Sequence, residues 1–196
     1  MVPIAAPPWF VAIGASGPVG LDDIGAVLLD LPATLEAVVL IVLHRPWDQK
    51  SQLRAILSRT SRMPVVIASQ GERFQPGTVY IGEPAEHLIL VARSFGSLVK
   101  DPDRQHTNRT LDLLLHSLAD HAGPRGIGVV LSGFLDDGAR GLAAIHHAGG
   151  LTMVLEPSGS PIQDMPRSAI AYDGPIDVIG DPCEIARAIV AVVSGS

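Results

Sequence analysis

The segment WFVAIGASGPVGLDDIGAVL, residues 9–28, joins an apolar run to a turn of small residues and then to a helix-like pattern. The run before Ser16 contains no charged residue, which is typical of a strand buried on both faces. Apolar residues at helical spacing then predict a helix over 21–31, with Asp22 and Asp23 in its first turn. A buried strand that leads through a short turn into a helix is the repeating unit of a parallel α/β sheet.

The same alternation continues along the chain. The segment 71–92 has turn residues between two short apolar runs and predicts a local antiparallel hairpin, and the polar segment 93–109 predicts a surface loop. We therefore expect an α/β fold, doubly wound, with a mostly parallel sheet, helices on both faces and a small antiparallel hairpin. Further strands are expected at 37–44, 64–69, 127–133, 151–156 and 177–180, and further helices at 48–59 with Asp48 as N-cap, at 110–121, from about 137, at 165–172 and from 182.

Composition and charge limit the possible functions. The 196 residues suffice for one domain with a buried core, and we expect residues 1–196 to form it. The net charge of −6 gives no support for nucleic-acid binding. A single cysteine suits a reducing compartment, and no basic residue precedes the first strand, as a signal peptide would require. No apolar run reaches the roughly 18 residues of a membrane span. We expect a soluble, cytoplasmic protein without membrane insertion.

Three polar residues are expected at the carboxyl ends of strands, where ligands bind in such sheets. They are Ser16, His44 and Asp137, the last beside Asp136. Taken singly, Ser16 and Asp137 are well explained as helix caps, and His44 as a hydrogen-bonded structural histidine. Taken together, they supply a nucleophile, a base and an orienting carboxylate. The remaining histidines show no metal-binding spacing, and we interpret them as surface or packing residues: His87, His106, His116, His121, His146 and His147.

A nucleotide-binding turn is the alternative for the same glycines. Gly14, Gly17 and Gly20 follow a strand at the spacing G-x-x-G-x-x-G. That fingerprint expects an acidic residue at the end of the second strand, where this chain has His44 and Arg45. Catalysis is therefore the better interpretation.

Five motifs, in order along the chain, resemble the catalytic domain of the CheB-type protein-glutamate methylesterase/glutaminases, the chemotaxis receptor methylesterases. They are IGAS at 13–16, LHRP at 43–46, GERFQPGTVYIGEPAEHL at 71–88, VVLSGFLDDGARG at 129–141 and MPRSAI at 165–170. The resemblance extends over nearly the whole chain.

This resemblance implies a role for each candidate residue. Ser16 would be the nucleophile, His44 the general base and acid, and Asp137 the orienting acid, because the family's aspartate directly precedes a glycine. The amides of Gly17 and Phe134 would bind the oxyanion. The substrate would be a glutamate methyl ester on a chemoreceptor or another methylated protein. Glutamine deamidation is also implied, and no metal or cofactor is required.

The chain departs from the family pattern at two motifs. Gly17-Pro18-Val19 replaces Thr-Gly-Gly, so Pro18 removes one possible donor. The segment 108–112 is Asn-Arg-Thr-Leu-Asp where the family has Arg-Pro-Ser-Val-Asp, so we expect an altered substrate rim.

Regulation is expected to differ as well. About eight residues precede the first strand. We therefore expect a stand-alone domain without the family's receiver domain, controlled by a partner in trans or by the loop at 93–109. Two other functions remain open: hydrolysis of an unrelated ester, and a non-catalytic signalling or binding module that retains the fold.

Overall fold

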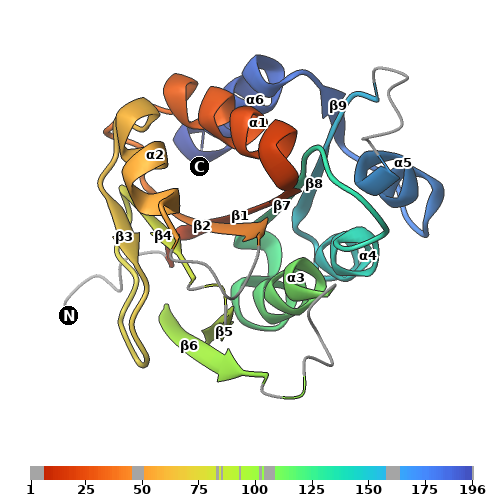
Figure 1. Ribbon diagram of the computed structural model, residues 1–196. Helices are drawn as coiled ribbons and strands as arrows, with labels where there is room; N and C mark the ends of the chain where they lie inside the picture. The colour runs from red at the N-terminus through yellow and green to blue at the C-terminus, as the bar shows by residue number, and fades with distance from the viewer. Residues whose placement is uncertain are drawn as a thin grey trace, which may run out of the picture.

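A seven-stranded parallel sheet forms the centre of the molecule (Figure 1). The computed structural model describes residues 7–45, 51–82, 84, 86–92, 94–101, 103, 109–157 and 164–195. The strands are β1 (Trp9–Ser16), β2 (Ala37–His44), β3 (Val65–Ile67), β4 (Thr78–Ile81), β7 (Gly126–Val130), β8 (Leu151–Leu155) and β9 (Val178–Gly180), in the spatial order β3-β4-β2-β1-β7-β8-β9. The helices are α1 (Gly17–Asp30), α2 (Leu53–Thr60), α3 (Thr110–Ala122), α4 (Ala139–His147), α5 (Asp164–Ala171) and α6 (Pro182–Ser194), with a 3₁₀ turn, η1 (Gly123–Arg125).

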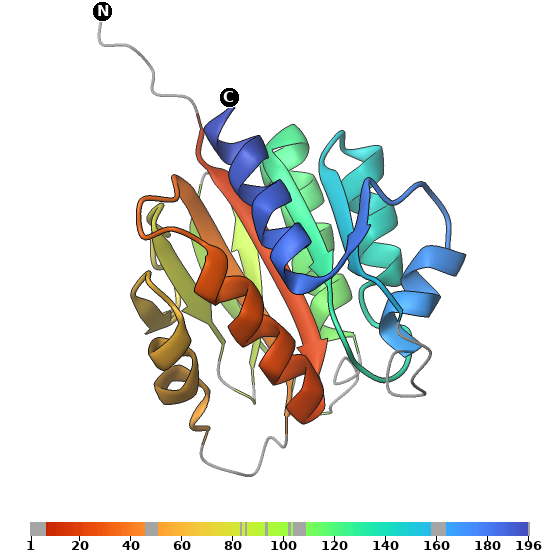
Figure 2. The same cartoon turned by 90° about the horizontal axis from the view of Figure 1, so that it is seen from above.

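Helices cover both faces of the sheet (Figures 1 and 2). Side chains alternate along β1: Val11 and Ile13 join the apolar cluster under α1, α2 and α6, whereas Phe10 and Ala12 join the cluster under α3 and α4. Complete burial of a side chain as large as Ile13 contributes about 1.5–3 kcal/mol. The predicted α/β class, with helices on both faces, is therefore confirmed.

The antiparallel hairpin lies at a different place from the predicted one. We expected both of its strands within 71–92, but Thr78–Ile81 is β4, a parallel strand between β2 and β3. The hairpin pairs β5 (Glu86–Val91) with β6 (Phe95–Lys100), so the expectation of a loop throughout 93–109 was wrong. The reason is long-range pairing, because β4 completes its backbone hydrogen bonds with strands that lie elsewhere in the sequence.

Helix α1 also begins earlier than predicted. It starts at Gly17 instead of residue 21, so no acidic residue lies in its first turn. Proline is tolerated in a first turn because the amide there has no partner within the helix, and Pro18 therefore does not delay the start. The serine of the turn consequently stands at the junction of β1 and α1. Helix α2 begins at Leu53, and its predicted N-cap, Asp48, lies outside the described residues.

Strand order identifies the edge of the sheet where a ligand site is expected. Strands β2, β4 and β3 lie on one side of β1, and the later strands β7, β8 and β9 lie on its other side. In open α/β sheets, ligands bind at the carboxyl ends of strands where the order reverses in this way. That point is the carboxyl end of β1. Within the described part of the chain, no helix has the length and apolar character needed to cross a bilayer.

Candidate active site

Ser16 and His44 end neighbouring strands. They are register partners in the parallel pairing of β1 with β2, so their backbones lie one strand spacing apart, about 4.8 Å. Ser16 occupies the N-cap position of α1 with extended backbone angles, φ −139° and ψ 140°, yet its side chain makes no capping hydrogen bond. Ser16 is partly exposed, and its hydroxyl is not engaged as a helix cap.

Asp137 approaches His44 from the loop after β7. Its Oδ2 atom lies 2.6 Å from Nε2 of His44, and the two side chains are 1% and 18% exposed. Asp136 is different: its side chain is 52% exposed, and its carboxylate lies 3.8 Å from Arg140. The structure therefore brings Asp137, and not Asp136, to the histidine.

Backbone amides of α3 orient the Asp137 carboxylate. Oδ2 accepts a hydrogen bond from Leu111 N at 2.9 Å, and Oδ1 accepts one from Asp112 N at 2.8 Å. Both donors lie in the first turn of α3, where amides have no partner within the helix and where the helix dipole favours a negative charge. With these bonds made, the carboxylate has one defined orientation toward His44.

The loop after β7 packs directly against the serine. Ser16 N donates to Ser132 O at 2.9 Å, and Met165 N at the start of α5 donates to Gly133 O at 3.1 Å. A β-carbon at Gly133 would lie 2.8 Å from Cβ of Ser16 and would also collide with the sulfur of Met165. Only glycine allows strand, loop and helix to meet this closely.

The two predicted oxyanion residues lie side by side. Gly17 has a left-handed φ of +71°, and a β-carbon there would lie 4.0 Å from the ring of Phe134. Phe134 is 51% exposed, on the loop that contacts Ser16. The position of Gly17 has room for a side chain, but its backbone conformation strongly disfavours one.

A matched pair of glycine variants tests the Gly17 amide. Gly17→Ala forces a left-handed alanine, at a cost of about 1 kcal/mol, and displaces an amide beside the serine. We expect about 10²-fold slower ester hydrolysis, the usual effect of losing one oxyanion donor. Gly71→Ala is the control, because Gly71 has a φ of +72° and no atom within 4 Å of an added β-carbon. The unfolding temperature should fall by a similar amount in both variants. Equal rates of ester hydrolysis in the two variants would show that the Gly17 amide takes no part in the reaction.

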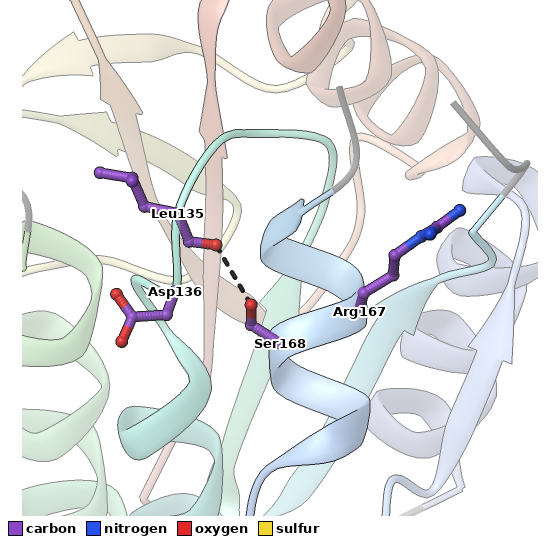
Figure 3. A pocket seen from close by; sticks show the side chains of 4 residues that line it. All are labelled: Leu135, Asp136, Arg167 and Ser168. Carbon is purple, nitrogen blue, oxygen red and sulfur yellow. Dashed lines mark hydrogen bonds between the residues drawn. The ribbon is translucent and has the colours of Figure 1, made fainter. Parts of the chain in front are cut away.

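A pocket beside the same loop is lined by Leu135, Asp136, Arg167 and Ser168 (Figure 3). The Ser168 hydroxyl donates to Leu135 O at 3.3 Å and so joins α5 to the loop. Leu135 is 55% exposed and has a φ of +71°, uncommon for a residue other than glycine. With its neighbour Phe134, it forms an exposed apolar rim on the loop whose backbone contacts Ser16.

Comparison with known proteins agrees with this geometry. The sequence model of the family described as CheB methylesterase matches residues 11–189. The chain belongs to the CheB methylesterase family. It is 33% identical over 196 residues to the protein-glutamate methylesterase/protein-glutamine glutaminase of Pectobacterium atrosepticum, covering 98% of this chain and 55% of the relative. It is 36% identical over 180 residues to the protein of the same name from Yersinia pestis, covering 90% and 51%. The chain thus spans about half the length of these curated relatives.

A solved structure of the CheB methylesterase family has the same fold. The crystal structure of the Thermotoga maritima CheB methylesterase catalytic domain superposes with a TM-score of 0.85 at 26% identity, covering 95% of this chain and 100% of that one. The family resemblance inferred from the five motifs is therefore confirmed.

Sequence reasoning missed the part played by Asp112. It was noted only as the last residue of an altered motif, but it is 4% exposed and accepts hydrogen bonds from the amides of Gly138 and Gly141, at 3.0 and 2.8 Å. Burial raises the pKa of Asp112; the amide of Gly141 opposes this, and the nearby charge of Asp137 adds to it. An acidic residue in the first turn of a predicted helix was the available signal, but it suggested only a local dipole effect.

His87 is a second residue whose contacts were missed. It is 6% exposed on β5, its Nδ1 lies 3.0 Å from Oγ1 of Thr110, and its Nε2 lies 3.2 Å from Asp101. Thr110 is the first residue of α3. His87 therefore contacts the first residue of α3, the helix whose amides bind the Asp137 carboxylate.

Proposed function

We propose that this protein is a serine hydrolase that removes methyl esters from glutamate side chains of a methylated protein. The observation that carries the proposal is the 2.6 Å contact between His44 and the buried Asp137, beside a serine in register with that histidine. A weak hydroxyl nucleophile needs such a base, and the base needs such a carboxylate. Membership of the CheB methylesterase family supports the choice of ester.

In the proposed mechanism, Ser16 Oγ attacks the ester carbonyl while His44 accepts its proton. Nε2 faces Asp137, so Nδ1 is the nitrogen left to exchange the proton. The tetrahedral intermediate collapses, the carbon–oxygen bond to methoxide breaks, and His44 returns the proton to release methanol. Water then attacks the acyl-enzyme by the same route, which frees the glutamate and restores Ser16. Asp137 stabilises the imidazolium formed in each half of the cycle.

The oxyanion of each tetrahedral intermediate is assigned to the amides of Gly17 and Phe134. Gly17 directly follows Ser16, and a β-carbon at Gly17 would lie 4.0 Å from the ring of Phe134 on the loop after β7. Pro18 offers no amide, so the first turn of α1 contributes fewer donors than a turn without proline. No metal or cofactor takes part in these steps.

The proposed substrate is the cytoplasmic helical part of a chemoreceptor or another methylated protein, which places the reaction in the cytoplasm. Relatives named protein-glutamate methylesterase/protein-glutamine glutaminase support glutamine deamidation as a second reaction, with ammonia as the leaving group. The exposed side chains of Phe134 and Leu135 provide the rim on which the substrate chain would rest. Control by a partner in trans belongs to the same proposal.

Methanol release from a methylated receptor fragment tests this function. We expect release with the purified chain and none from the unmethylated fragment, together with covalent labelling of Ser16 by a serine-directed phosphonate. Labelling without methanol release would indicate a different ester substrate. A chain that is neither labelled nor active would be a binding module. Saturable binding of a dinucleotide would instead support the nucleotide-binding interpretation of Gly14, Gly17 and Gly20.

A further inference from the structure

We propose that Asp112 is a positioning residue that holds Asp137 in place for His44. The proposal rests on the proposed function only in taking Asp137 as the acid of the site. Four hydrogen bonds cross between the starts of α3 and α4. Asp137, just before α4, accepts from Leu111 N and Asp112 N of α3, and Asp112 accepts from Gly138 N and Gly141 N of α4.

Each of the two helices, α3 and α4, is capped at its start by a carboxylate from the other helix or its flank. The N-cap residues are Arg109 for α3 and Gly138 for α4, and neither makes a side-chain capping bond. A capping side chain normally satisfies the amides two or three residues into its own helix. Here Asp137 satisfies two such amides of α3, and Asp112 satisfies the amides of Gly138 and Gly141 at the start of α4. The starts of the two helices therefore cannot move independently.

This exchange constrains Asp137 from two sides. The Asp112 amide holds Oδ1 of the Asp137 carboxylate directly. The Asp112 carboxylate holds the amide of Gly138, the residue bonded to Asp137 through the chain. Without that carboxylate, the buried amides of Gly138 and Gly141 would lose their acceptor, at about 1–3 kcal/mol each, and the backbone carrying Asp137 would be free to shift. A small shift is enough to spoil a hydrogen bond of 2.6 Å to His44.

The role calls for hydrogen-bond acceptors and does not require a negative charge. Oδ1 of Asp112 accepts both amides, and an asparagine oxygen could do the same. Oδ2 faces Arg109 at 3.4 Å and Arg140 at 3.9 Å, and both arginine side chains are 42% exposed and able to turn toward water. Asp112→Asn should therefore preserve the positioning that Asp112→Ala removes.

The rate of Ser16 labelling by a phosphonate measures this positioning independently of the natural substrate. Asp112→Ala should slow labelling about 10- to 100-fold, the usual range when a group orienting a functional ligand is removed. It should also weaken the far-downfield proton resonance of the His44–Asp137 hydrogen bond. Asp112→Asn should label within about threefold of wild type. On any ester that is turned over, kcat should fall in Asp112→Ala while KM stays nearly constant, because the imidazolium forms only in the transition state.

Asp177→Ala is the matched control. Its carboxylate also holds a backbone amide, Thr152 N at 2.8 Å, but at the start of β8, on the opposite edge of the sheet. The Asp177→Ala variant should lower the unfolding temperature without slowing labelling.

If Asp112→Ala does not fold, Asp112→Ser takes its place, because a serine hydroxyl is too short to reach both the Gly138 and Gly141 amides. Labelling at the wild-type rate in a folded Asp112→Ala or Asp112→Ser variant would overturn the proposal. So would equal slowing by Asp177→Ala, or an Asp112→Asn variant as slow as Asp112→Ala. Absence of methanol release would count only against the proposed function.

Discussion

Ser16→Ala is expected to lower methanol release from methylated receptor by about 10⁴- to 10⁶-fold, because it removes the nucleophile of the proposed mechanism. The variant should fold normally, since Ser16 makes no side-chain capping bond that alanine would remove. Steady-state hydrolysis and phosphonate labelling measure the loss, and circular dichroism checks the fold.

The double variant Ser16→Ala/His44→Ala makes this test sharper. A nucleophile and its base act as one unit, so the double variant should be scarcely slower than either single variant. Losses that multiply would show that the two residues contribute independently, contrary to the proposed mechanism.

Asp137→Asn is expected to lower turnover by about 10³- to 10⁴-fold, the second largest effect. Asparagine carries one oxygen, whereas Asp137 now accepts three hydrogen bonds, from His44, Leu111 and Asp112. In one orientation the NH₂ group faces the amide of Asp112, and in the other it faces both His44 Nε2 and the amide of Leu111. In either orientation the imidazolium that forms during the reaction loses its counter-charge. The rate is measured on the same ester, with thermal unfolding as a check on the fold.

Asp136→Asn is the matched control for that variant. The Asp136 carboxylate is exposed and lies 3.8 Å from Arg140, so the turnover of Asp136→Asn should stay within about tenfold of wild type. An inactive Asp136→Asn variant together with an active Asp137→Asn variant would show that Asp136, and not Asp137, is the acid of the site.

Local patterns were sufficient to predict most of the sheet. The strand ending at His44 has the predicted bounds, and the helix after residue 109 and the last helix begin at the predicted residues. Long apolar runs report burial on both faces, and that property belongs to the segment itself. Short elements were harder to predict: β4 has four residues, and β6 mixes apolar residues with Gly96, Ser97 and Lys100, so neither shows a periodicity that identifies its partner strand.

The sequence by itself determined the fold class, the family and the three candidate residues, because each is expressed in a short contiguous motif. Only the tertiary structure decided which atoms meet. His44 and Asp137 are 93 positions apart, and Asp112 and Asp137, which link the starts of α3 and α4, are 25 positions apart. Side-chain hydrogen bonds depend on tenths of an ångström, and those distances are set by how strands and helices pack. A motif can therefore name a carboxylate, but the packing of α3 against α4 determines what that carboxylate holds.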